Sequence, residues 1–252
     1  MSKLVEKLSK ASRSVTTPIG FHSAINGIKG SSMLLIAAIA SDTISIKPLA
    51  GSSIDAALIL DPDVTVTKTK KLIKLLGDIP LGLATDQLNT NDIAEYCLIG
   101  LDFIAFNKNT SITSMQMNAT GKFFIIDSAM NMDLVRALNS LDIHGAIIDN
   151  SKVDSLTIEH LLICKRFREI LRKPLLMLVS SLITDYELHQ LWETGISGVV
   201  FPSNWTSESL EKLRHTVDNL PKIRAHQTDK PEVILPQYDT RDESLDEEEE
   251  EE

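Results

Sequence analysis

The sequence lacks the short motifs that mark common nucleotide-binding, zinc and serine-nucleophile sites. It contains no Gly-x-Gly-x-x-Gly turn and no Walker loop, so neither of the standard phosphate-cradling backbones is present. Its six histidines include no His-x-His pair and no Glu-x-x-His spacing, which argues against a histidine-ligated zinc ion. The pair Ser180-Ser181 lacks the Gly-x-Ser-x-Gly elbow that exposes a serine nucleophile. No motif of high specificity therefore names a reaction.

Cysteines and long apolar runs are also few. Cys97 and Cys164 fall inside expected helices among apolar neighbours, so we interpret them as buried free thiols of a reducing compartment, not as a disulfide or metal ligands. The longest apolar run, Met33–Ala40, is far shorter than the ~20 residues that span a bilayer. Residues 1–13 show no continuous apolar stretch of the secretory kind. We expect a cytoplasmic protein with no membrane partner.

Charge of one sign is concentrated in a single place, the C-terminal end. The net charge is −10, and residues 241–252 hold nine acidic residues and one basic residue, which leaves −2 for the other 240 residues. This composition predicts a disordered acidic tail over residues 222–252, suited to a basic protein partner. The near-neutral remainder shows no clustered basic face, so we expect no nucleic-acid partner.

Eight short apolar runs, by contrast, recur along the chain at similar intervals. Such runs suit strands buried on both faces, as in a parallel sheet covered by helices. Seven of the eight are followed directly by Ser, Asp, Asn or Thr, and polar residues at strand ends are typical of the active-site rim of a (β/α)8 barrel. The runs are Met33–Ala40, Ala56–Leu60, Leu81–Ala84, Phe103–Phe106, Phe123–Ile126, Gly145–Ile148, Leu175–Val179 and Gly198–Phe201.

The fold class that we predict is α/β, a single (β/α)8 barrel over residues 1–221. The length fits, because such barrels run to about 250 residues as one domain. An amphipathic helix over residues 3–10 is expected to plug the bottom of the barrel. The competing interpretation, an open doubly wound sheet, would show a broken strand rhythm or a glycine-rich first turn, and neither is present. Further helices are expected over residues 67–76, 92–99, 132–138, 157–171, 185–194 and 207–219, with Asn91, Thr184 and either Thr206 or Ser207 as N-caps.

Two helix-to-strand turns share a local pattern. Gly100 and Gly195 are each followed by an aliphatic residue, a small polar residue and then an apolar run. Glycine at such a position ends a helix in the left-handed region, and the aliphatic residue packs back on that helix. The repetition concerns stability and says nothing of catalysis.

Residues 193–203, Glu-Thr-Gly-Ile-Ser-Gly-Val-Val-Phe-Pro-Ser, resemble the segment that enters the eighth strand of aldolase-type and ribulose-phosphate-binding (β/α)8 barrels. In those families phosphate usually meets glycine-rich turns after strands seven and eight. The resemblance implies an anion site here at Ser180, Ser181, Ser203 and Asn204, just before a helix that begins near Ser207. The glycines of the family pattern are absent from these positions.

Four carboxylates follow strands two, three, five and six, and a closed barrel would bring them to its mouth: Asp61, Asp86, Asp127 and Asp149. They could hold a divalent cation or share acid–base work, or each could cap a turn or helix. Lys108, after the fourth strand, completes the candidate catalytic set with Asp61, Asp127 and Asp149. Its polar neighbours favour a solvated loop lysine. No lysine falls inside an expected strand, which argues against a Schiff-base aldolase.

Two functions remain open at this point. The first is a lyase or isomerase that acts on a small anionic metabolite, with a divalent metal as a possible cofactor. The second is a non-catalytic, degenerate barrel that serves as a binding or scaffold protein and recruits a partner through its acidic tail. The ring of polar strand ends favours the first, and the missing glycines and strand lysine favour the second. A homo-oligomer is possible under either interpretation.

Overall fold

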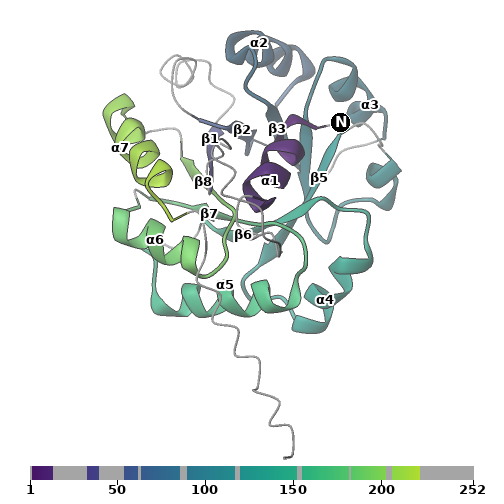
Figure 1. Cartoon of the computed structure of the whole chain (residues 1–252). Helices are drawn as coiled ribbons and strands as arrows, with labels where there is room; N and C mark the ends of the chain where they lie inside the picture. Colours follow the sequence, from purple (N-terminus) through teal and green to yellow (C-terminus); the bar gives the residue numbers. More distant parts are fainter. Residues whose placement is uncertain are drawn as a thin grey trace, which may run out of the picture.

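Eight parallel strands close into a barrel in the order of the sequence, as predicted, because β8 pairs with β1 (Figure 1). The computed structural model describes residues 2–13, 33–39, 54–61, 64–85, 90–116, 120–151, 155–181, 183–202 and 206–221. The strands are β1 (Leu34–Ile39), β2 (Ala56–Ile59), β3 (Leu81–Thr85), β4 (Phe103–Phe106), β5 (Gly121–Asp127), β6 (Gly145–Asn150), β7 (Leu175–Val179) and β8 (Gly198–Pro202). The expected acidic tail lies outside the described residues.

A ring of helices surrounds the barrel (Figure 1). The described helices are α1 (Lys3–Arg13), α2 (Val66–Leu76), α3 (Thr90–Leu98), η2 (Ile112–Gln116), α4 (Met132–Ala137), η3 (Leu138–Ser140), α5 (Ile158–Ile170), α6 (Asp185–Glu193) and α7 (Ser207–Asp218). Thr184 and Thr206 cap α6 and α7 as predicted, each by accepting a backbone N–H three residues ahead. Asn91 is not a cap, because α3 already begins at Thr90. Gly100 and Gly195 take φ values of 96° and 99°, which confirms the two helix-ending turns.

The strands separate two apolar layers, one inside the barrel and one under the helices. Along β1, Leu34 and Ile36 belong to the inner cluster, while Leu35 and Ala37 belong to the outer one. The rings of Phe103 and Phe123 fill the interior and meet edge to face with centroids 5.5 Å apart. Gly82 makes room for them, since a Cβ there would lie 2.2 Å from Phe103 Cε2. The barrel is therefore a packed core and not a pore.

Helix α1 lies across the end of the barrel where the strands begin, as predicted (Figure 1). Leu4 and Leu8 are fully buried in the inner cluster. The carboxylate of Asp102, just before β4, accepts hydrogen bonds from the Ser2 hydroxyl (2.7 Å) and from the backbone N–H of Lys3 (2.7 Å) and Leu4 (3.0 Å). Asp102 thus caps α1 from elsewhere in the chain and fixes it to the bottom of the barrel.

A lysine lies inside a strand, which corrects the expectation that none would. Strand β5 begins at Gly121, two residues before the apolar run, and so includes Lys122, whose side chain is 2% exposed. Its ammonium group donates to Asp142 Oδ2 at 2.6 Å, and its backbone N–H donates to His144 Nδ1 at 3.1 Å. Lys122 lies at the start of β5, away from the strand ends that form the mouth. The aliphatic part of the side chain is covered by neighbours while the charged end reaches an acidic partner.

Candidate functional site

Two of the four strand-end carboxylates lie side by side at the mouth. Asp127 is the last residue of β5, and it is the register partner of Asp149 in β6. Both follow the inward-facing alternation, two residues after Ile125 and Ile147, which contact the inner cluster. Neighbouring strands are about 4.8 Å apart, so these carboxylates form a pair at the C-terminal face.

Each carboxylate of this pair also closes a turn of its own loop. Asp127 Oδ1 accepts the Ala129 N–H at 3.0 Å. Asp149 Oδ1 accepts both the N–H (3.0 Å) and the hydroxyl (2.6 Å) of Ser151. These are the local hydrogen bonds that the capping interpretation requires. Among the described residues, these turn bonds use Oδ1 of each carboxylate and leave Oδ2 out.

Asp61 and Lys108 do not join this pair. Asp61 is half-buried after β2, which is separated from β5 by two other strands of the barrel. Lys108 is exposed in a polar turn after β4, where the Asn107 side chain accepts the Asn109 N–H at 2.8 Å. An exposed lysine in such a turn fits the solvated-loop interpretation, because a Schiff-base lysine needs apolar surroundings that lower its pKa.

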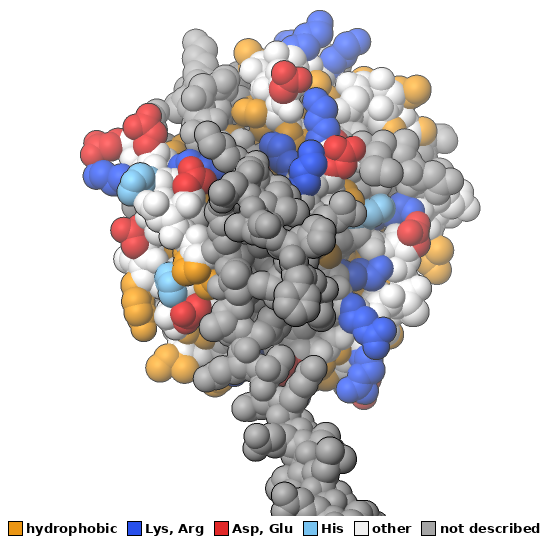
Figure 2. Space-filling model, in the orientation of Figure 1, with side chains coloured by type: hydrophobic (Ala, Val, Ile, Leu, Met, Phe, Trp, Pro, Cys, Tyr) orange, Lys and Arg blue, Asp and Glu red, His pale blue; other side chains and the backbone are white. Residues whose placement is uncertain are grey.

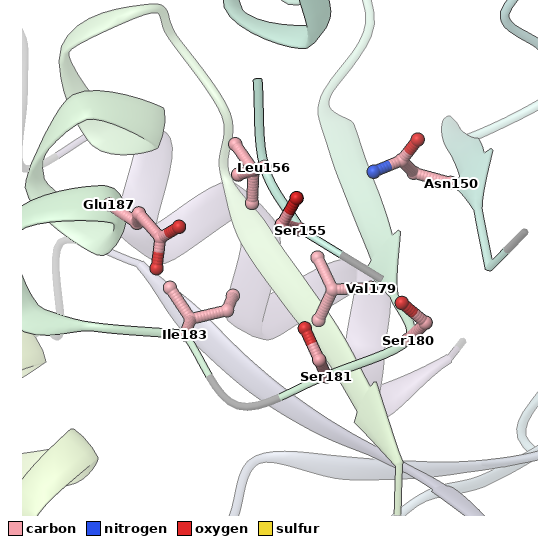
Figure 3. A pocket seen from close by; sticks show the side chains of 8 residues that line it. All are labelled: Asn150, Ser155, Leu156, Val179, Ser180, Ser181, Ile183 and Glu187. Carbon is pink, nitrogen blue, oxygen red and sulfur yellow. The ribbon is translucent and has the colours of Figure 1, made fainter. Parts of the chain in front are cut away.

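Ser180 and Ser181 line a pocket just beyond the end of β7 (Figure 3). Its empty volume is about 210 Å³, part of which is open to solvent. The described residues around it are Asn150, Ser155, Leu156, Val179, Ser180, Ser181, Ile183 and Glu187. Sequence reasoning missed Asn150 and Glu187. The signal for Asn150 was a polar residue at an outward-facing position of a strand, where an apolar residue packs under the helices.

The other two residues of the predicted anion site, Ser203 and Asn204, lie outside the described residues, as does Asp86. The helix that follows them is well defined. Thr206 accepts the Ser209 N–H at 3.3 Å, and Glu208 places a carboxylate in the first turn of α7. The Thr206 cap and the Glu208 carboxylate therefore already satisfy part of the hydrogen-bonding and electrostatic capacity of this helix N-terminus for a negative charge.

The strongest polar cluster lies at the opposite, N-terminal face. The hydrogen bond from Lys122 and its positive charge lower the pKa of Asp142, and burial lowers the pKa of His144. Burial also lowers the pKa of Lys173, which donates to the backbone oxygens of Leu141 and Ile143. These groups hold loops together beneath the barrel. Their pKa shifts come from burial and from a structural ion pair, both of which also perturb pKa values outside catalytic sites.

No metal centre is assembled by the described residues, since no three of their His, Cys, Asp or Glu side chains gather closely enough to hold an ion. Neither cysteine forms a disulfide in the described part of the chain, and Cys164 is buried in α5, where burial raises its pKa to about 12. None of the described helices is both long and apolar enough to cross a membrane.

Solved structures similar to this one support the barrel fold, whereas comparisons of the sequence find no match. No family model and no curated protein matches the chain. Similar solved structures include a mutant tryptophan synthase alpha-subunit from Pyrococcus furiosus, with a TM-score of 0.59 and 13% identity over 75% of this chain and 98% of that chain. Tryptophan synthase from M. tuberculosis, in an open form, matches with a TM-score of 0.63 and 9% identity over 86% of this chain and 98% of that chain.

The closed parallel barrel and these likenesses define the class of protein. The chain has an aldolase-type (β/α)8 barrel fold, similar to that of tryptophan synthase alpha-subunits. At identities this low the likeness shows the fold alone, so the chemistry has to be argued from the residues at the mouth.

Proposed function

We propose that this barrel binds a small anionic metabolite at the C-terminal face of its strands, as a lyase or isomerase. In this proposal the reacting part of the ligand faces Asp127 and Asp149. Its anionic group is held beyond β7 and β8 by Ser180, Ser181, Ser203 and Asn204. The fold favours this end of the barrel, because active sites of (β/α)8 enzymes are built from the loops that follow the strands.

The observation that carries the proposal is the register pairing of Asp127 with Asp149. Two carboxylates side by side at the mouth of a barrel can divide acid–base work on one ligand between them. Such a pair offers an acid and a base within reach of one ligand. The free Oδ2 atoms are the atoms that would hold or move the proton.

A second candidate, a non-catalytic binding barrel, is favoured by a different observation. Both carboxylates already serve their own turns through Oδ1, and Lys108 is exposed. A barrel whose strand-end aspartates only cap loops would keep its fold and lose its chemistry. The acidic residues 241–252 would then recruit a basic protein partner.

Replacement by asparagine separates the two roles of the aspartates. Asparagine keeps the turn-capping oxygen and removes the charge, so Asp127→Asn with Asp149→Asn should leave the melting temperature nearly unchanged under both proposals. Inorganic phosphate, the probe for the anion site, should raise the melting temperature of the parent protein. In Ser203→Asp, phosphate should raise the melting temperature very little, because the new carboxylate repels phosphate.

The double asparagine variant then tests whether the anion is held away from the carboxylate pair. With the charge pair removed, the repulsion between the mouth and an anion falls, so phosphate should bind the variant at least as tightly as the parent. If millimolar phosphate stabilises none of these proteins, the anion site is absent and the non-catalytic barrel becomes the better proposal.

A further inference from the structure

Helix α2 carries four exposed lysines and no acidic residue: Lys68, Lys70, Lys71 and Lys74. The helix buries Thr69, Leu72 and Leu76 beneath it. At 3.6 residues per turn, the lysines therefore lie mainly on the outward side. Figure 2 shows basic side chains at the upper edge of the molecule, where Figure 1 places α2. These four residues are called the lysine face below.

The positive charge of the lysine face is not compensated within the described part of the chain. None of its four ammonium groups forms an ion pair there. Asp78, just past the end of the helix, pairs with Lys3 of α1 at 3.5 Å instead. Lys70 and Lys74, one turn apart, carry like charges, and such a pair destabilises a helix.

The first turn of α2 also differs from those of the other helices. Each of the other six described α-helices has an acidic residue in its first turn, where the helix dipole favours negative charge. The first turn of α2 contains Lys68 instead, and of the four lysines only Lys74 lies in the last turn, where the dipole favours a cation. Local charges that disfavour the helix they belong to are typical of functional surfaces, and this one suits a negatively charged partner.

The other basic stretch of the barrel, at the end of α5, is different. Residues 165–173 contain five basic residues, but Glu169 lies among them. Arg168 Nη1 and Lys173 Nζ each donate to two backbone oxygens, so these two cations already hold the fold together. Helix α2 is therefore the clearer unpartnered basic surface among the described residues.

The same chain contains a segment of opposite charge. Residues 241–252 include nine acidic residues and one basic residue. We propose that the acidic run 242–252 lies against the lysine face of its own chain. Exposed ion pairs contribute little to stability and are screened by salt, so this contact is loose and hardly changes the melting temperature.

The chain is long enough to make this contact. Helix α7 follows β8 and α2 follows β2, and both strands pair with β1, so the two helices are two positions apart in the ring. That separation is roughly 20 Å around the barrel, with roughly 17 Å more along α2 itself. Residues 222–241 span up to about 66 Å when extended. Because the segment is tethered, its effective concentration is about millimolar, which favours it over an external acidic partner.

The test compares NMR spectra of the full chain, labelled with nitrogen-15, with those of a chain that lacks residues 241–252. At about 0.01 M salt, where charges act over about 30 Å, the backbone amides of α2 should differ in shift between the two chains. At about 1 M salt the difference should disappear, because the screening length falls to about 3 Å. No difference at α2, or a difference that persists at high salt, would overturn the proposal.

Substitutions on each side assign the contact. Lys70→Gln, Lys71→Gln and Lys74→Gln together keep good helix formers and remove the charge, so the tail-dependent shifts of α2 should be lost. The matched control, Lys165→Gln with Arg166→Gln on α5, should retain them. Replacement of Glu247–Glu252 by glutamine keeps the length of the chain and should reproduce the shortened chain. Tail-dependent shifts confined to residues 165–173 would place the contact on α5 and overturn the proposal.

Dilution separates the chain's own segment from that of a second copy. A contact within one chain does not depend on protein concentration, so the α2 shifts should stay constant, whereas shifts that weaken on dilution would overturn the assignment to the same chain. The inference does not depend on the proposed function, because neither the lysine face nor residues 241–252 belong to the mouth. Under the non-catalytic alternative, a basic partner would have to displace the acidic run from α2.

Discussion

The two ends of this barrel use their charged residues in different ways. At the N-terminal face, charged side chains join elements far apart in the sequence. Asp102 holds α1, and Asp55 Oδ2 accepts both the Leu35 N–H at 3.0 Å and Arg214 Nη1 of α7 at 2.9 Å. At the C-terminal face, the hydrogen bonds of Asp127 and Asp149 to other described residues stay within their own loops. The described charged residues of the N-terminal face thus connect distant segments, whereas loops at the opposite face are where (β/α)8 enzymes build their active sites.

Figure 2 shows the face that carries α1, where both basic (blue) and acidic (red) side chains are visible on the described residues, with several basic side chains following one another along the lower right edge. One of the long-range pairs there is Lys122 with Asp142. Interspersed charges of opposite sign suit cross-linking of neighbouring segments.

Replacement of an aspartate by alanine at each end of the barrel should give the largest difference in the free energy of unfolding. Asp102→Ala removes the acceptor of three hydrogen bonds from the start of α1 and from Ser2 before it, and a hydrogen bond to a charged group contributes about 1.5–3 kcal/mol net, less where water reaches it. We expect a loss of about 3 kcal/mol in the free energy of unfolding, measured by urea denaturation. Asp127→Ala, which removes one local turn bond, should cost about 0.5–1 kcal/mol. Equal losses at both sites would contradict the division between the two ends.

The second contrast lies within the Lys122–Asp142 pair. Asp142→Ala leaves a 2% exposed lysine without its acidic partner, whereas Lys122→Met removes the charge and keeps the packing. Asp142 itself is largely exposed, so water screens part of the loss, and we expect about 2 kcal/mol for Asp142→Ala. Lys122→Met should cost less than that. Urea denaturation of both variants gives the comparison, and a larger loss for Lys122→Met would show that the ion pair itself is strongly stabilising.

A smaller effect concerns pH at the same face. Burial lowers the pKa of His144 below its usual 6.5, so the folded state binds fewer protons than the unfolded state in that range. The stability that results is complete above pH 6.5 and is lost as pH falls through the lowered pKa. The free energy of unfolding should therefore fall on acidification below pH 6.5. His144→Asn keeps an acceptor for the Lys122 N–H and should flatten this part of the curve; an unchanged curve would assign the loss to other groups.

The smallest expected effect is that of the acidic end. Removal of residues 241–252 should leave the melting temperature of the barrel unchanged, because a solvated acidic run buries no apolar surface. Differential scanning calorimetry of the full and shortened chains measures this. A clear drop would show that the segment packs on the barrel and would move the domain boundary at residue 221.

The fold could be predicted from the sequence because the strands are buried on both faces. A short apolar run such as Leu175–Val179 then marks a strand with the bounds that the structure gives. The prediction of strand bounds was weaker where a polar residue lies in a strand because its partner is distant in the sequence. Lys122 lies in β5 because Asp142, 20 residues later, accepts its charge, and no local pattern contains that partner. Asn91 failed as a cap because α3 begins one residue earlier.

The candidate site was predicted only in part. Counting positions past each strand placed Asp127 and Asp149 at the mouth, but their direct pairing follows from the β5–β6 register, which the sequence does not specify. Prediction of the pocket would have required contacts between residues of different elements, beyond the residues at the strand ends. Asn150 at the end of β6 and Glu187 in the first turn of α6 line the same pocket, and that proximity depends on the closed barrel.

Mapping of phosphate binding by NMR on the full chain tests most directly whether the C-terminal face is the binding face. Inorganic phosphate is titrated while backbone amide shifts are followed at both ends of the barrel. We predict saturable shifts at Ser180, Ser181 and Thr206, and no change at Lys3 and Leu4, whose N–H groups are held by Asp102. Shifts confined to the N-terminal face, or no saturable shift at all, would contradict the division of the barrel into a stabilising end and a binding end.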